Sequence, residues 1–255
     1  MIEVNKLHKG FNGVEVLKGI STSFKPGETS LIIGQSGSGK TVFLKSLIGL
    51  HTPEKGNIVF DGRVNTEMTI EDKRNFRKEL GMVFQGSALF DSQTVEENVM
   101  FPLKMFTKQS DKEMLERANF VLKRVDLVGS NKKYVAELSG GMQNRVAIAR
   151  AIVMRPKYLF CDEPNSGLDP QTAIIIDNLI KEITEEYQIT TVINTHDMNS
   201  VMEIGEKILF LKNGKKAWEG SNKEIFKTDN EAVVNFVYSS NLFKKVRQAY
   251  LNEKK

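Results

Sequence analysis

The feature that most constrains the fold of this chain is the glycine-rich stretch GQSGSGKT, residues 34–41. It follows the apolar run LII and leads into KTVFLKSLIGL, whose apolar residues have helical spacing. Glycines at this spacing let backbone N–H groups converge on an anion, and the N-terminus of the following helix adds its dipole. The sequence therefore predicts a buried strand, a phosphate-binding loop and a helix, in that order.

Each polar residue of this loop has an expected role. Lys40 is expected to neutralise the β- and γ-phosphates of a nucleoside triphosphate, and Thr41 to offer its hydroxyl to Mg²⁺. A flexible glycine–serine loop is the alternative, and the order of strand, loop and helix argues against it. The other residues expected to hold the nucleotide are Gly34, Gln35, Ser36, Gly37, Ser38, Gly39 and Val42.

Hydrolysis of a nucleoside triphosphate also requires a metal ligand and an oriented water. The apolar run YLFC ends in Asp162 and Glu163. We expect Asp162 to hold Mg²⁺ and Glu163 to polarise the attacking water, although a carboxylate pair at a strand end can also be a solvated turn. Gln85 follows LGMVF, where its amide can contact Mg²⁺ or the water, and His196 follows TTVIN, where its ring can reach the γ-phosphate.

The order of the other segments predicts an α/β fold. Residues 1–33 alternate apolar and polar positions, as expected of a small, mostly antiparallel sheet. The runs KYLFCDEP and TTVINTHD are expected to be buried parallel strands joined by the helix PQTAIIIDNLIKEITEEY, and LGMVFQ a strand that ends at Gln85. Residues 94–126 predict a helical lobe whose helix breaks near Pro102 and again at 108–110.

Charge and hydropathy exclude some classes of protein. The net charge is only +4, and 36 basic residues are interspersed with 32 acidic ones, which argues against nucleic acid as the main ligand. No window approaches the roughly 18 to 20 apolar residues that span a bilayer. The start MIEVNKLHKG lacks the pattern of a secretory signal, so we expect a cytoplasmic location.

A second anion-binding helix terminus begins about a hundred residues after the phosphate loop, in ELSGGMQNRVAIARAI. Ser139, Gly140 and Gly141 stand at the start of this helix, where backbone N–H groups are free to bind an anion. Two such termini would be redundant in one subunit. Two subunits paired head to tail could instead place each helix over the other subunit's γ-phosphate.

With these motifs in order, the chain resembles the ATP-binding subunits of ABC transporters up to about residue 220. GQSGSGKT matches Walker A, Gln85 the Q-loop, LSGGM the signature, YLFCDE Walker B, SGLD the D-loop and His196 the switch histidine. The resemblance adds Asp169 of SGLD to the nucleotide-binding residues, and places Phe11 where an aromatic ring stacks on adenine. Asn165 stands where threonine is commoner, and we expect no loss of activity from it.

The family resemblance implies a P-loop NTPase of the ABC-ATPase fold. A RecA-like core, an antiparallel β subdomain and an α-helical subdomain at about 86–155 would form the ATPase domain, residues 1–220. Residues 221–255 would form a C-terminal helical extension. The resemblance also implies ATP and Mg²⁺ as cofactors, a homodimer that closes on ATP, and an integral membrane permease as partner at the cytoplasmic face of the inner membrane.

The segment after the Q-loop, which normally faces the permease, resembles that of the Mla/Mce lipid-transport ATPases. It implies phospholipid transport between inner and outer membranes with an MlaE-type permease and an Mce-domain protein. The alternatives are a soluble ABC ATPase of iron–sulfur cluster assembly, or the ATPase of another importer or exporter. The residues that match the lipid-transport group are Ala88, Leu89, Phe90, Val95, Glu97, Asn98, Val99, Phe101, Pro102 and Leu103.

Overall fold

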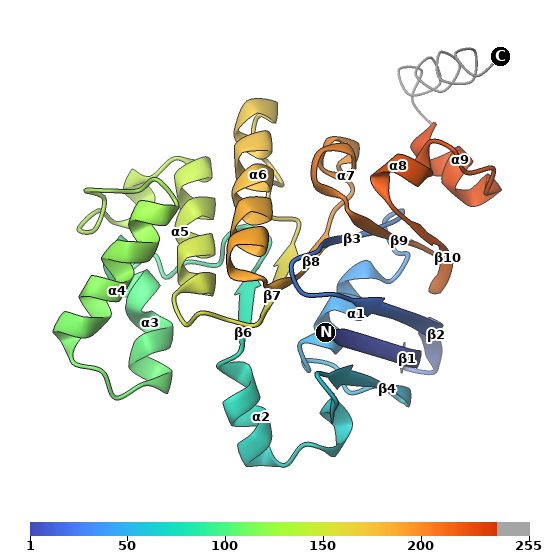
Figure 1. Cartoon of the computed structure of the whole chain (residues 1–255), viewed down its shortest axis with the longest axis horizontal. Helices are drawn as coiled ribbons and strands as arrows, with labels where there is room; N and C mark the ends of the chain where they lie inside the picture. The colour runs from blue at the N-terminus through green and yellow to red at the C-terminus, as the bar shows by residue number, and fades with distance from the viewer. Residues whose placement is uncertain (239–255) are drawn as a thin grey trace.

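The computed structural model describes residues 1–238 and confirms the predicted α/β fold (Figure 1). Its larger sheet has the strand order β10-β9-β3-β8-β7-β6, in which only β10 runs antiparallel to its neighbour. The strands are β3 (Thr29–Ile33), β6 (Leu80–Val83), β7 (Tyr158–Asp162), β8 (Thr190–Asn194), β9 (Lys207–Lys212) and β10 (Lys215–Gly220).

A second, antiparallel sheet is built from the N-terminal segments, as predicted. Its order is β2-β1-β4-β5. Asp61 and Gly62 both have positive φ, and they form the tight turn between β4 and β5. The strands are β1 (Ile2–Phe11), β2 (Val14–Phe24), β4 (Lys55–Phe60) and β5 (Arg63–Val64).

The alternation of side chains along the parallel strands divides the interior into two cores. In β3, Leu31 and Ile33 enter the core formed with the later helices, whereas Ile32 faces the core between the two sheets. In β7, Phe160 lies between the sheets and Cys161 on the helical side. Because both faces are covered, these strands are fully buried and their sequences are continuous apolar runs.

Helices cover both faces of the parallel sheet. Helix α1 (Lys40–Leu47) packs between the two sheets, and α6 (Pro170–Tyr187) lies on the opposite face (Figure 1). Between β6 and β7 the chain forms the predicted helical lobe, α3 (Val95–Phe106), α4 (Asp111–Arg124) and α5 (Gly140–Ile152). The remaining helices are α2 (Ile70–Arg77), α7 (Met198–Ile204), α8 (Asn222–Ile225) and α9 (Glu231–Val237).

Two predicted boundaries are wrong. Helix α3 continues through Pro102, because the buried side chains of Val99, Met100 and Leu103 hold it in the lobe and outweigh the roughly 3 kcal/mol cost of an internal proline. Strand β6 ends at Val83, not at Gln85, so Gln85 stands on the loop that follows.

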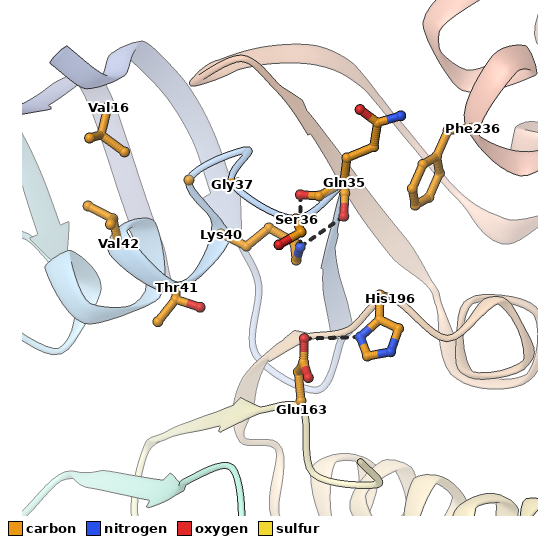
Figure 2. A pocket seen from close by; sticks show the side chains of 12 residues that line it. Val16, Gln35, Ser36, Gly37, Lys40, Thr41, Val42, Glu163, His196 and Phe236 are labelled. Atoms are coloured by element: carbon orange, nitrogen blue, oxygen red, sulfur yellow. Dashed lines mark hydrogen bonds and ion pairs between the residues drawn. The ribbon is translucent and has the colours of Figure 1, made fainter. Parts of the chain in front are cut away.

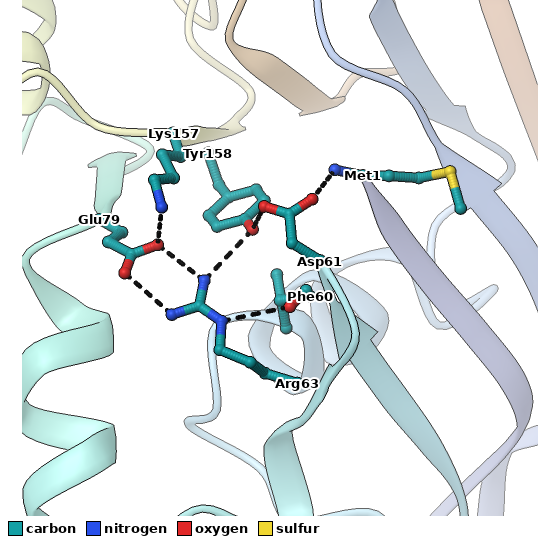
Figure 3. Close-up of polar contacts among 7 residues, drawn as sticks. All are labelled: Met1, Phe60, Asp61, Arg63, Glu79, Lys157 and Tyr158. Carbon is teal, nitrogen blue, oxygen red and sulfur yellow. Dashed lines mark hydrogen bonds and ion pairs between the residues drawn. The ribbon is translucent and has the colours of Figure 1, made fainter.

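A polar cluster ties the two sheets together (Figure 3). Arg63 of β5 donates two hydrogen bonds, of 2.9 and 2.7 Å, to the carboxylate of Glu79, and Lys157 lies 3.3 Å from the same carboxylate. The hydroxyl of Tyr158, at the start of β7, donates to Asp61 in the β4–β5 turn. We call these five residues the Arg63 cluster.

The C-terminal segment is helical as far as it is described, through α8 and α9. The part of the predicted extension beyond residue 238 lies outside the described residues. The domain limits at 220 and at 86–155 stay a prediction. In residues 1–238, no helix combines the length and the hydropathy that crossing a bilayer requires.

Candidate nucleotide-binding site

The phosphate loop lies between β3 and α1, as the sequence predicts. Gly34 has φ +151°, and a Cβ built there would lie 2.3 Å from the carbonyl oxygen of Leu211 on β9. Only glycine therefore fits at the point where the loop leaves the sheet. The hydroxyl of Ser38 is buried and has no hydrogen-bond partner, which is the state expected of a group whose partner is a ligand.

Lys40 is the buried cation of the loop. Its Nζ donates to the backbone carbonyls of Gly34 and Gln35, at 2.8 and 3.2 Å. Burial lowers the pKa of Lys40, and the nearby carboxylates of Glu163 and Asp162 only partly oppose this effect. An ammonium group held by carbonyls alone is suited to a strongly anionic ligand.

Asp162 is the last residue of β7 and Glu163 follows it, at the carboxyl edge of the sheet. Asp162 is nine-tenths buried, and its Oδ1 accepts a hydrogen bond from Nδ2 of Asn194 at 2.9 Å. The Oδ1 of Asn194 is buried and has no partner. Asn194 ends the neighbouring parallel strand β8, so the register of two strands places an amide and a carboxylate side by side.

Glu163 is held between two polar side chains from distant parts of the sequence. Nδ1 of His196 lies 3.0 Å from one carboxylate oxygen, and Nε2 of Gln85 donates to the other at 3.2 Å. The backbone of Glu163 has φ +48°, an uncommon conformation for a residue with a side chain. The three predicted catalytic residues therefore meet at one carboxylate.

A cavity of about 620 Å³ joins the phosphate loop to this carboxylate (Figure 2). Glu163 and His196 lie opposite Lys40 across it. Two lining residues were not predicted, Val16 of β2 and Phe236 of α9, and neither belongs to a sequence motif. Its lining residues are Val16, Gly34, Gln35, Ser36, Gly37, Gly39, Lys40, Thr41, Val42, Glu163, His196 and Phe236.

The structure does not bring the other predicted residues to this cavity. Ser139 caps α5 by accepting a hydrogen bond from the N–H of Met142, and Asp169 caps α6 by accepting from the N–H of Thr172 at 3.0 Å. Phe11 is exposed at the end of β1. Ser139, Gly140, Gly141, Asp169 and Phe11 do not line the cavity, so their nucleotide contacts stay a prediction. Ser38, Gln85 and Asp162 adjoin or contact lining residues but do not line the cavity themselves, so their contacts with nucleotide or metal also stay a prediction.

Gly141 has a structural reason to be glycine. A Cβ at this position would lie 2.6 Å from Cγ2 of Thr172 on α6. The close packing of α5 on α6 therefore accounts for Gly141 without a ligand, whereas Ser139 and Gly140 are exposed at the start of α5. The exposed positions are the ones free to meet another molecule.

The residues in and beside the cavity fit ATP with Mg²⁺. The loop offers the buried ammonium of Lys40 and the unpaired hydroxyl of Ser38. It also has glycine at position 34, where the backbone of β9 passes too close for a side chain. Among residues 1–238 no group of three or more His, Cys, Asp or Glu could hold a metal alone. Mg²⁺ that arrives on phosphates needs only one or two protein ligands, and Thr41 and Asp162 would hold it while Gln85 reaches it from the loop after β6.

Comparison with known proteins places the chain in a family. The sequence profile of ABC transporters matches residues 17–166. The probable ribonucleotide transport ATP-binding protein Mkl of Mycobacterium tuberculosis is 37% identical over 91% of this chain and 65% of its own length. The methionine import ATP-binding protein MetN of Clostridium tetani is 41% identical over 89% of this chain and 71% of its own. The chain thus spans about two thirds of the length of these relatives.

Solved structures resemble the chain across the whole cassette. A bacterial ABC transporter cassette solved as a dimer superposes with a TM-score of 0.80 and 33% identity, covering 87% of this chain and 99% of its own. The same cassette in a post-hydrolysis state, bound to ADP and Pi, gives a TM-score of 0.78. The sequence matches, the fold and the geometry around Lys40 and Glu163 agree: the chain belongs to the ABC transporter family and carries its ATP-binding cassette, whose cofactors are ATP and Mg²⁺.

Proposed function

We propose that this chain hydrolyses ATP as the nucleotide-binding subunit of an ABC transporter. The observation that carries the proposal is the position of Glu163, held by Gln85 and His196 across one cavity from Lys40. A carboxylate there can orient the attacking water, and Lys40 can stabilise the charge on the transferred phosphoryl group. Asp162 would hold Mg²⁺, which neutralises charge on the phosphates when bound.

The working unit is a homodimer in this proposal. Ser139 and Gly140 are exposed away from the cavity of their own chain, so they are available to a second subunit's nucleotide. The similarity to a cassette solved as a dimer supports the same arrangement. If Ser139 acts in this way, monomers trapped apart lose most of their ATPase activity, and full activity in such monomers would contradict the proposal.

A groove of about 290 Å³ next to the Q-loop is the surface we assign to an integral membrane permease. It lies between β6, α3 and α5, and it is lined mainly by apolar side chains with Arg77 and Arg150. Phe90 and Phe101 pack with their rings 4.7 Å apart, and Asn98 fixes Phe90 through hydrogen bonds to its backbone. A permease in this groove would place the chain at the cytoplasmic face of the inner membrane.

The substrate we propose is a phospholipid, moved between membranes with an MlaE-type permease and an Mce-domain protein. Its support is the segment 88–103. Within it Val95, Val99 and Leu103 are buried in the lobe, and Glu97 completes the cap of α3 with Thr94. Four residues of this segment line the groove, and we propose that they determine which permease binds: Ala88, Phe90, Phe101 and Pro102.

The relatives favour a second candidate, an importer of methionine or a transporter of ribonucleotides, as their names state for them. Tagged Glu163→Gln protein, purified from detergent-solubilised native membranes, separates the candidates when mass spectrometry identifies the bound proteins. A permease together with an Mce-domain protein supports lipid transport. A permease with a soluble substrate-binding protein supports the second candidate, and soluble cluster-assembly proteins without a permease would contradict transport.

A further inference from the structure

Helix α9 contributes one side chain to the nucleotide cavity, and no motif of the family accounts for it. Phe236 lines the cavity together with Gln35, Ser36 and Gly37 of the phosphate loop. Figure 2 shows it at the end of the cavity where His196 lies, opposite Val16 and Val42. Phe236 is about two hundred residues from the loop in sequence, so only the fold brings them together.

The placement of Phe236 is firmly anchored. Its ring packs on Phe210 of β9 with a centroid distance of 5.1 Å, and β9 pairs with β3, the strand that leads into the loop. Val233 and Val237 of the same helix are buried. Asn230 caps α9 and donates from Nδ2 to the carbonyl of Ala217 on β10 at 3.1 Å. Helix α9 is therefore fixed on the sheet edge beside the loop.

A second, smaller cavity of about 80 Å³ continues along the contact of α9 with the loop. It is lined from the loop by residues 35–38, from β9 by Phe210, and from α9 by Ala232, Asn235 and Phe236. The loop is therefore backed by α9 on the side away from α1. A change in the position of α9 would change the space available to the backbone of residues 35–37.

The chemistry of the ring limits what it can do. A phenyl group offers phosphate no hydrogen bond, but it excludes water from its surroundings, and ionic interactions are stronger where water is excluded. The cavity also holds Lys40, Glu163 and His196, and His196 lies on the same side of it as Phe236 (Figure 2). These are the groups that we expect to meet the terminal phosphate and the attacking water, so the ring lies beside the γ-phosphate end of the cavity.

We propose that Phe236 is a residue of the nucleotide site, and that it makes the site favour ATP over ADP by shielding the γ-phosphate end from water. This inference rests on the proposed ATP-hydrolysing function. It also links the C-terminal segment to the nucleotide, because any partner that moves α9 moves Phe236 with it.

The test is calorimetric titration of the full-length protein with Mg-ATP and with Mg-ADP. All variants carry Glu163→Gln, so that ATP is not consumed during the titration. We expect Phe236→Ala to weaken ATP binding roughly three- to tenfold, on the scale of one lost shielding contact, and to leave ADP binding within twofold. Phe236→Leu keeps an apolar side chain and should restore most of the ATP affinity.

The matched control is Phe226→Ala, which removes a ring of the same segment that contacts Tyr238 and does not line the cavity. It should bind both nucleotides like the parent. Equal weakening of ATP and ADP by Phe236→Ala would show a general loosening of the loop and overturn the inference. Unchanged affinities in Phe236→Ala would also overturn it. Failure of the parent protein to bind ATP would instead overturn the proposed function.

Discussion

The Arg63 cluster and the site around Lys40 each hold a cation beside acidic side chains, and they differ in how those charges are satisfied. Arg63 donates two hydrogen bonds to Glu79, and this pairing holds the pKa of Glu79 below its usual value. Lys40 reaches only backbone carbonyls, and burial lowers its pKa. A cation paired with a carboxylate, such as Arg63, stabilises the folded chain. A buried cation without a carboxylate partner, such as Lys40, costs stability, and a bound anionic ligand can offset that cost.

The same contrast extends to the residues around each cluster. The site side carries the unpartnered buried oxygens of Ser38 and Asn194, whereas no side-chain atom of the Arg63 cluster is buried without a partner. Asp177 of α6 is 3% exposed, and the two groups that hydrogen-bond to its carboxylate, Nδ2 of Asn165 and the hydroxyl of Ser200, are neutral. Buried polar groups that lack a hydrogen-bond partner or a counter-charge thus occur near the proposed nucleotide site and not in the Arg63 cluster.

The largest expected effect is on turnover. Glu163→Gln should lower kcat roughly a hundredfold or more, because a positioned catalytic group is lost, and should leave ATP binding intact. Phosphate release and nucleotide titration measure the two quantities. Glu79→Gln is the matched change in the Arg63 cluster and should alter stability without altering kcat. Unchanged turnover in Glu163→Gln would remove Glu163 from its assigned role.

The next effect is on stability and depends on pH. Burial raises the pKa of Asp177 from 3.8 to about 6, so the native state holds a proton that the unfolded state releases, and stability falls as the pH rises between these values. Above pH 6 the buried charge costs roughly 3 kcal/mol. Asp177→Asn should therefore equal the parent near pH 4 and exceed it by up to that amount at pH 7.5.

Urea unfolding at several pH values between 4 and 7.5 measures this difference. Asp177 faces Asn165 from the loop after β7 and Ser200 from α7, and the charges of Asp197 and Glu203 also raise its pKa. Thr184→Val, at another buried polar position of α6, is a control whose effect should not vary with pH. If Asp177→Asn changed the free energy of unfolding equally at every pH, the cost assigned to the buried charge of Asp177 would be wrong.

The smallest effect compares the two cations directly. Arg63→Met should lower the free energy of unfolding by about 1–2 kcal/mol, the range for a partly exposed bidentate pair, and leave ATP affinity unchanged. Lys40→Met should weaken ATP binding and change stability little, because the loss of two hydrogen bonds to backbone carbonyls is offset by the relieved cost of burying the charge. Thermal unfolding and nucleotide titration of both variants measure these effects. If the two variants changed stability and ATP affinity alike, the proposed difference between the two cations would be wrong.

Local patterns predicted most of the elements near the site. The strand–loop–helix around residues 34–41 and the helix 170–187 were predicted because glycine spacing and apolar periodicity are properties of neighbouring residues. Pro102 misled the prediction for α3, because its local cost is outweighed by contacts with the rest of the lobe. The end of β6 at Val83 was missed for a similar reason, since pairing with β7 decides where the strand stops.

Local sequence is enough to specify the chemical groups of the site: the phosphate loop, Lys40, and the acidic pair at the end of a buried strand. Strand order and packing set which of these groups meet. Gln85 and His196 reach Glu163 because three neighbouring parallel strands end at one edge of the sheet. Phe236 reaches the cavity because α9 docks on β9 and β10. Contacts between residues far apart in the chain depend on strand order and packing, which no local pattern encodes.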